Sequence, residues 1–186
     1  GYVLDLRSNP GGLLEASIEI ARQWLDEGII VSTETKDGIK DVRRAKGRAL
    51  TTRPVVVLVD GGSASASEIL SGAIQDNKRG ILVGEKTFGK GLVQSVRALS
   101  DGSGMTVTIA KYLTPNGRDI NKHGIAPDIE SKMSEKDALI FTKKDLATDR
   151  DTQYKAAERA LRNLIEDTKL NTTYNPNASN IKYALR

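Results

Sequence analysis

A run of five apolar residues, Val55 to Val59, constrains the fold of this chain more than any other feature of its sequence. Strands that are apolar on both faces are typical of a parallel sheet that other elements cover on both sides. A helical pattern follows at 65–75, and a second short apolar run follows at 81–83. Strand, helix and strand in this order form a βαβ unit, so we predict an α/β fold with a largely parallel sheet.

The remaining predicted elements lie on either side of this unit. The patterns predict strands at 2–6 and 29–35, a helix at 13–25, a hairpin with arms at 92–96 and 105–112, and an amphipathic helix at about 151–167. Residues 36–53 are polar and basic, and we expect a solvated connection there. The Asn-rich stretch 171–180 is expected to be loosely ordered.

The connection at 36–53 accounts for the whole formal net charge of +4, because it contains seven Lys or Arg residues and only two Asp residues. A basic segment can bind nucleic acid. Aromatic residues make up only 4% of the chain, however, and the charges lie in a stretch that contains glycine. We therefore treat nucleic-acid binding as a disfavoured alternative.

The chain has no Cys and one His, which excludes a cysteine nucleophile, a thiolate metal site and any site that needs two histidines. The strongest remaining candidate is the segment 60–68, DGGSASASE, between the buried run and the following helix. Its hydroxyl groups lie beside the free amides of a helix N-terminus, which can stabilise an oxyanion. The residues Ser65 to Glu68 also match a capping box, a pattern that often does no more than begin a helix.

A serine nucleophile needs a base, and the sequence offers two candidates. His123 lies in a turn-like stretch that is more typical of a surface imidazole. A lysine can serve instead if it is desolvated or lies near other cations. The segment 84–90 has the P-loop pattern GxxxxGK, but Gly91 stands where a P-loop has Ser or Thr, and 92–96 alternates like a strand. We therefore disfavour nucleotide binding and expect this turn to deliver Lys90 to a dry site.

Several long runs in one order resemble the carboxyl-terminal processing peptidases, also called tail-specific proteases. The matching runs are LDLRSNPGG (4–12), VLVDGGSASASEIL (57–70), GEKTFGKGLVQ (84–94), YLTPNGRDINKHGIAPDI (112–129) and DTQYKAAERAL (151–161). The resemblance implies a ββα-type, crotonase/Clp-protease-like peptidase core at 1–130, with 131–186 as a C-terminal helix and tail packed on it. It also implies a PDZ domain upstream, and we expect this chain to be a fragment that lacks that region.

The resemblance implies the catalytic residues one by one. Ser65 corresponds to the family's nucleophile, Lys90 to its general base, and Gln94 to a residue that steadies the lysine amine. The offset of four between Lys90 and Gln94 places them on one face if this stretch is extended.

The resemblance also implies an oxyanion hole and one supporting residue. The oxyanion donors would be the amides of Gly11 and Ala66, with Gly12 as the nearest competitor of Gly11. Asp76 corresponds to an Asp implicated in some family members, and we expect it to support the structure.

The function that the resemblance implies is a serine endopeptidase that cuts near an apolar C-terminus of protein or peptide substrates, through an acyl-enzyme and with no cofactor or metal. The family generally works in a periplasm or thylakoid lumen, and the C-terminal part resembles the branch with the photosynthetic forms. A non-catalytic peptide-binding scaffold of the same fold is the alternative. No apolar run approaches the roughly 18 residues of a membrane-spanning helix.

Overall fold

The computed structural model describes residues 1–174 of the 186-residue chain. Its elements in chain order are β1 (Tyr2–Asp5), α1 (Leu14–Trp24), β2 (Ile29–Thr35), β3 (Gly38–Arg44), β4 (Val55–Val59), α2 (Ala66–Asp76), β5 (Ile81–Gly84), β6 (Leu92–Ala98), β7 (Gly104–Leu113), β8 (Ile129–Glu130), α3 (Glu135–Ile140) and α4 (Thr152–Tyr174). Among these residues, no helix has the length and apolar character needed to cross a lipid bilayer.

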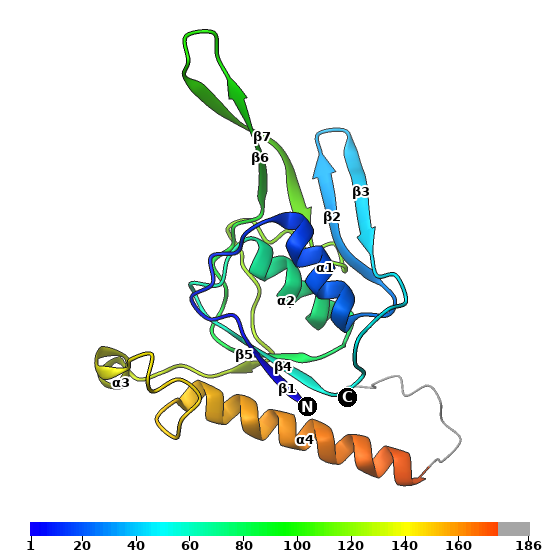
Figure 1. The fold of residues 1–186 in the computed structure, drawn as a ribbon, viewed down its shortest axis with the longest axis vertical. Coiled ribbons are helices and arrows are strands. Elements are labelled where there is room, and N and C mark those ends of the chain that lie inside the picture. Colours follow the sequence, from blue (N-terminus) through cyan, green and yellow to red (C-terminus); the bar gives the residue numbers. More distant parts are fainter. Residues whose placement is uncertain (175–186) are drawn as a thin grey trace.

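A four-stranded parallel sheet in the order β1-β4-β5-β8 forms the centre of the fold (Figure 1). Every residue of β4 is buried. Because side chains alternate across a strand, Val55, Val57 and Val59 pack in the cluster that contains α1 and α2. Val56 and Leu58 instead pack in the cluster that contains α4. The predicted βαβ unit is therefore confirmed as β4, α2 and β5.

A second sheet is antiparallel, in the order β3-β2-β7-β6, so the prediction of a largely parallel sheet holds for one sheet of two. The predicted hairpin corresponds to β6 and β7. The prediction of a solvated connection at 36–53 is wrong for its first half, because β3 pairs with β2 there. As an edge strand, β3 exposes Asp41 and Arg44 to solvent, so a polar composition does not prevent strand formation.

Helix α4 covers the face of the parallel sheet opposite α1 and α2 (Figure 1). Ala157 and Ala160 pack against the β4 side chains Val56 and Leu58. The helix predicted at about 151–167 is present and continues to Tyr174. The prediction of loose order at 171–180 is therefore wrong for 171–174, and residues 175–180 lie outside the described residues.

Candidate active site

Ser65 lies on the turn that joins β4 to α2, at the N-cap position of the helix. Its backbone has φ 56° and ψ −116°, a left-handed conformation that residues with a Cβ rarely adopt. Strained backbone of this kind costs roughly 1–3 kcal/mol and concentrates at functional sites. The Ser65 carbonyl oxygen accepts hydrogen bonds from the amides of Glu68 and Ile69, at 2.9 and 3.0 Å. These bonds begin the helix and leave Ser65 half-buried at its end.

The carboxylate of Glu68 joins the turn of Ser65 to the loop of Lys90. Its Oε2 accepts from the Ser65 amide at 2.9 Å and from the Lys90 amide at 2.8 Å. Its Oε1 accepts from the Gly89 amide at 2.7 Å and from the Thr87 hydroxyl at 2.5 Å. Glu68 has no exposed surface. The backbone nitrogens of Ser65 and Lys90 thus both lie within 3 Å of one buried oxygen atom.

Glu68 and Thr87 are the residues that the sequence did not reveal as part of the site. The capping box correctly predicted the contact between Glu68 and the Ser65 amide. It gave no sign of the three donors from 87–90, because those residues come 19 to 22 positions later in the chain. A buried carboxylate requires several hydrogen bonds. The four-residue motif does not predict whether Glu68 is buried, so it could not predict these additional donors.

The loop 87–91 is also held from its other side, by the segment 120–125. The Thr87 amide donates to the Ile125 carbonyl at 3.1 Å, and the Thr87 hydroxyl accepts from the Ile125 amide at 2.7 Å. The Lys122 amide donates to the Gly89 carbonyl at 2.8 Å. Gly89 has φ +91°, and a Cβ there would lie 2.9 Å from the amide nitrogen of Gly124. The backbone that carries Lys90 is therefore fixed on both sides. The Lys90 side chain is exposed, so the expectation that the turn places it in a dry site is wrong for this structure.

Gly11 lies directly against the Ser65 turn. A Cβ on Gly11 would be 2.5 Å from the Ala64 carbonyl oxygen, 2.7 Å from the Ala66 nitrogen and 3.0 Å from the Ser65 Cβ. Gly11 also has φ +94°, a conformation that favours glycine. Gly12 differs, because a Cβ there would meet nothing within 4 Å. The structure thus brings Gly11, Ser65 and Ala66 together.

The two amides expected to stabilise an oxyanion differ in whether they already donate a hydrogen bond. Among residues 1–174, the Ala66 amide has no hydrogen-bond partner, as is usual for the first residue of a helix. The Gly11 amide donates to Asn9 Oδ1 at 3.0 Å, an interaction within its own loop. The Asn9 carbonyl oxygen in turn accepts from the Ala64 amide at 3.0 Å. Binding of an oxyanion by Gly11 therefore requires its amide to exchange the Asn9 side chain for the substrate.

The resemblance implies that Gly11 is an oxyanion donor, and on that reading Gly11→Ala should lower kcat by about 10²-fold or more, the loss typical of one displaced donor. The added Cβ is strained at φ +94° and meets the Ala64 carbonyl oxygen. Gly12→Ala is the matched control and should change kcat less than about threefold, because its Cβ has open space. Steady-state cleavage of a peptide substrate measures both. Equal activity in the two variants would contradict the assignment to Gly11.

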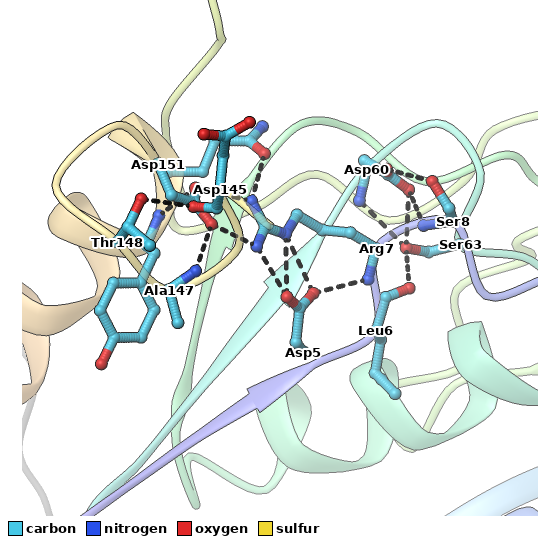
Figure 2. A network of polar contacts seen from close by, with 12 residues as sticks. Asp5, Leu6, Arg7, Ser8, Asp60, Ser63, Asp145, Ala147, Thr148 and Asp151 are labelled. Carbon is cyan, nitrogen blue, oxygen red and sulfur yellow. Dashed lines mark hydrogen bonds and ion pairs between the residues drawn. The ribbon is translucent and has the colours of Figure 1, made fainter. Parts of the chain in front are cut away.

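The loop that carries Gly11 is anchored at its start by Arg7 (Figure 2). The Arg7 guanidinium donates to both carboxylate oxygens of Asp151, each at 2.8 Å, and Arg7 Nη2 also donates to Asp5 at 2.7 Å. Asp151 precedes α4, and its side chain is fully buried. Burial alone would raise the pKa of the Asp151 carboxyl, but the hydrogen bonds from Arg7 and from two backbone amides hold that pKa below its ordinary value. One ion pair thus ties α4 to the Gly11 loop.

A second carboxylate ties the same loop to the turn after β4. Asp60 Oδ1 accepts from the Ser8 amide at 2.8 Å (Figure 2), and also from the Gly62 amide at 2.9 Å. The Ser63 hydroxyl donates to the Leu6 carbonyl oxygen at 2.7 Å. The side chains of Asp60 and Ser63 therefore hold the Ser65 turn to the backbone of the Gly11 loop.

Gln94 and His123 both expose their side chains to solvent. Gln94 is the third residue of β6 and pairs with Thr108 of β7. The argument that Lys90 and Gln94 share a face assumed an extended chain from Lys90, whereas β6 begins at Leu92. The strand also confirms that no helix follows the GxxxxGK segment, in disagreement with a P-loop.

Asp76 lies at the C-terminal end of α2, eleven residues after Ser65 and so about 16 Å along the helix. Its carboxylate accepts from the Asn116 amide at 2.9 Å and forms an ion pair with Arg118. The Asp76 side chain is 3% exposed. These contacts fix the turn that follows β7, at the opposite end of the helix from Ser65.

Several known proteins are similar to this chain in sequence and in fold. The model of peptidase family S41 matches residues 1–131. A carboxyl-terminal-processing protease of Synechocystis sp. is 55% identical over 157 residues, which are 84% of this chain and 36% of that protein. The carboxy-terminal processing protease CtpA of Bacillus subtilis is 39% identical over 178 residues, 94% of this chain and 38% of that protein.

A solved structure is also similar to this chain. The photosystem II D1 C-terminal processing protease superposes with a TM-score of 0.68 at 51% identity, over 70% of this chain and 34% of that one. The chain thus spans roughly a third of the length of these relatives.

Proposed function

Because this chain belongs to peptidase family S41, we propose that it carries the catalytic residues of a serine endopeptidase that cuts proteins near their C-termini. The observation that carries the proposal is the buried Glu68 carboxylate, which accepts from the amides of both Ser65 and Lys90. A nucleophile and its base must be held in fixed relative positions, and one shared hydrogen-bond acceptor does this for their backbones.

The proposed reaction begins with neutral Lys90, whose amine takes the proton from Ser65 Oγ as that oxygen attacks the scissile carbonyl carbon. The amides of Gly11 and Ala66 stabilise the negative charge on the carbonyl oxygen. Lys90 then protonates the departing amine, which leaves an ester of Ser65. Water hydrolyses the ester with Lys90 again as the base, and Gln94 orients the lysine amine in both steps.

An ordinary lysine amine is protonated at neutral pH, so a lysine base needs a dry environment or nearby cations. The Lys90 side chain is exposed in this structure. A bound polypeptide over the loop 87–91 would exclude water from the amine. We therefore expect substrate binding itself to activate the base.

The wider proposal concerns domains, substrates and location. Residues 1–130 would form a crotonase/Clp-protease-like catalytic core, with 131–186 packed on it through α4. Substrates would be proteins or peptides with an apolar C-terminus. Relatives in Tetradesmus obliquus and Arabidopsis thaliana are named chloroplastic, which supports a thylakoid lumen or another extracytoplasmic compartment.

The test is chemical labelling of the full-length protein with a biotin-tagged β-lactone, which acylates serine nucleophiles. We expect mass spectrometry to locate the label on Ser65 and labelling to be lost in Lys90→Arg. Ser67→Ala is the matched control, because Ser67 lies in the same SASAS run and should not be required. A protein that binds C-terminal peptides but neither cleaves them nor labels would instead be a peptide-binding scaffold.

A further inference from the structure

The antiparallel sheet has two edges, and their sequences differ in charge. The sheet order places β3 at one edge and β6 at the other. Strand β3, GIKDVRR, has four charged residues of seven, whereas β6, LVQSVRA, has only Arg97. Proteins usually protect edge strands from pairing with other chains by charges, prolines or covering elements. Strand β3 is protected by its charges, whereas β6 carries only one charge.

Among residues 1–174, no strand pairs with the outer side of β6, so its outward backbone groups lie at a free edge. The Leu99 amide donates to the Ser103 carbonyl at 2.8 Å at the end of the hairpin. Because the amides of an antiparallel strand point alternately toward and away from the partner, the amides of Arg97 and Ser95 face β7. Those of Val96 and Gln94 then face outward. The Val96 side chain is 75% exposed, so this stretch is also open to solvent.

Strand β6 follows the Lys90 loop of the candidate active site directly in the chain. It begins at Leu92, two residues after Lys90, whose amide is bound to Glu68. The β6–β7 hairpin projects away from the rest of the fold (Figure 1). A bulge lies beside Gln94, because Val93 pairs with Ala110 but Gln94 pairs with Thr108. Bulges increase strand twist and often occur next to active sites.

We propose that the substrate polypeptide pairs with the outer edge of β6 as an additional strand, and that this pairing leads its scissile bond to Ser65. The inference rests on the function proposed above. Main-chain hydrogen bonds to the outward groups of Gln94 and Val96 would supply affinity without a fixed sequence. The paired chain would also cover the loop of Lys90 and exclude water from its amine.

The test uses the full-length protein with Ser65→Ala, so that the substrate is bound but not consumed. The probe is a fluorescent twelve-residue peptide with an apolar C-terminus, N-methylated at one backbone amide at a time, and the measurement is Kd by fluorescence anisotropy. We expect alternate positions to weaken binding about tenfold and the positions between them to have little effect, because only every second amide faces β6. A profile without this period of two would overturn the proposal.

A variant of the protein gives an independent readout. Val96→Pro removes one outward amide and should raise KM about tenfold with kcat nearly unchanged, which a general loss of structure would not do. Val42→Pro on β3 is the matched control at the other edge and should leave KM within about twofold. Unchanged KM in Val96→Pro would overturn the proposal. So would a dimer by analytical ultracentrifugation that Val96→Pro dissociates, because a second copy would then occupy the edge.

The two proposals can fail separately. If Ser65 is labelled and peptides are cleaved but the N-methyl profile is flat, the edge-strand proposal is wrong and the protease function stands. If the profile has a period of two but Ser65 is never acylated, strand pairing stands and the catalytic function is wrong.

Discussion

Replacing Glu68 by Ala is expected to lower kcat/KM by at least about 10³-fold and the free energy of unfolding by about 3–5 kcal/mol. The substitution leaves four donors without their acceptor: the amides of Ser65, Gly89 and Lys90 and the hydroxyl of Thr87. Each unsatisfied buried donor costs about 1–3 kcal/mol, and relaxation of the loop recovers part of the total. The same relaxation causes the loss of activity, because a loop that has moved no longer holds Lys90 beside Ser65.

Glu68→Gln separates charge from shape. The Gln side chain keeps one acceptor oxygen but presents an NH₂ group to donors. We therefore expect kcat/KM and the free energy of unfolding to lie between the values of wild type and of Glu68→Ala. The control is Glu85→Gln, whose side chain is half-buried and accepts one long bond from Gln153 at 3.4 Å. Calorimetric Tm measures the stability of each variant, and peptide cleavage measures its activity. Full activity and an unchanged Tm in Glu68→Ala would show that the carboxylate does not organise the site.

The parallel sheet could be predicted from sequence because its signal is local. Buried residues on both faces of Val55–Val59 leave one plausible environment for the strand, and the following helix and strand fix the connection. Strand β3 could not be predicted in this way. It lies at an edge, it is held by pairing with β2, and its sequence resembles a charged loop.

The candidate site likewise has features that are visible in local sequence and features that depend on contacts between distant segments. Single residues could be proposed from motifs, because Ser65, Lys90 and Gly11 each occur in a long run that resembles one family. The interaction between those runs could not be read from them. Glu68 has a complete local explanation as a capping residue, and only the fold shows that its other bonds reach the next loop. The Arg7–Asp151 pair, 144 positions apart, was equally absent from the sequence patterns.

Ser65→Ala and Lys90→Arg are each expected to reduce turnover of a C-terminal peptide by at least about 10⁴-fold, as in other enzymes that lose a nucleophile or its base. Alanine lacks the attacking oxygen. Arginine keeps the positive charge and the length of the side chain but does not release a proton, so it cannot be the base. Both variants should unfold within about 1 °C of wild type, because neither changes the Glu68 contacts, which use backbone amides of these two residues.

Two controls exclude other bases. Lys86 lies directly before the loop 87–91 and is exposed, so Lys86→Arg should retain near-normal turnover. His123 is the one histidine of the chain, and His123→Ala should retain it as well. Loss of activity in His123→Ala with retention in Lys90→Arg would reassign the base to the imidazole.

The double variant tests whether Ser65 and Lys90 act as one unit. Residues of one catalytic unit are strongly non-additive, because the second substitution removes a group that has nothing left to act on. We therefore expect Ser65→Ala with Lys90→Arg to be no slower than Ser65→Ala alone in single-turnover cleavage. Additive losses would mean that the lysine contributes by itself, for example by binding the substrate carboxylate. The shared Glu68 acceptor would then position two independent groups rather than a nucleophile and its base.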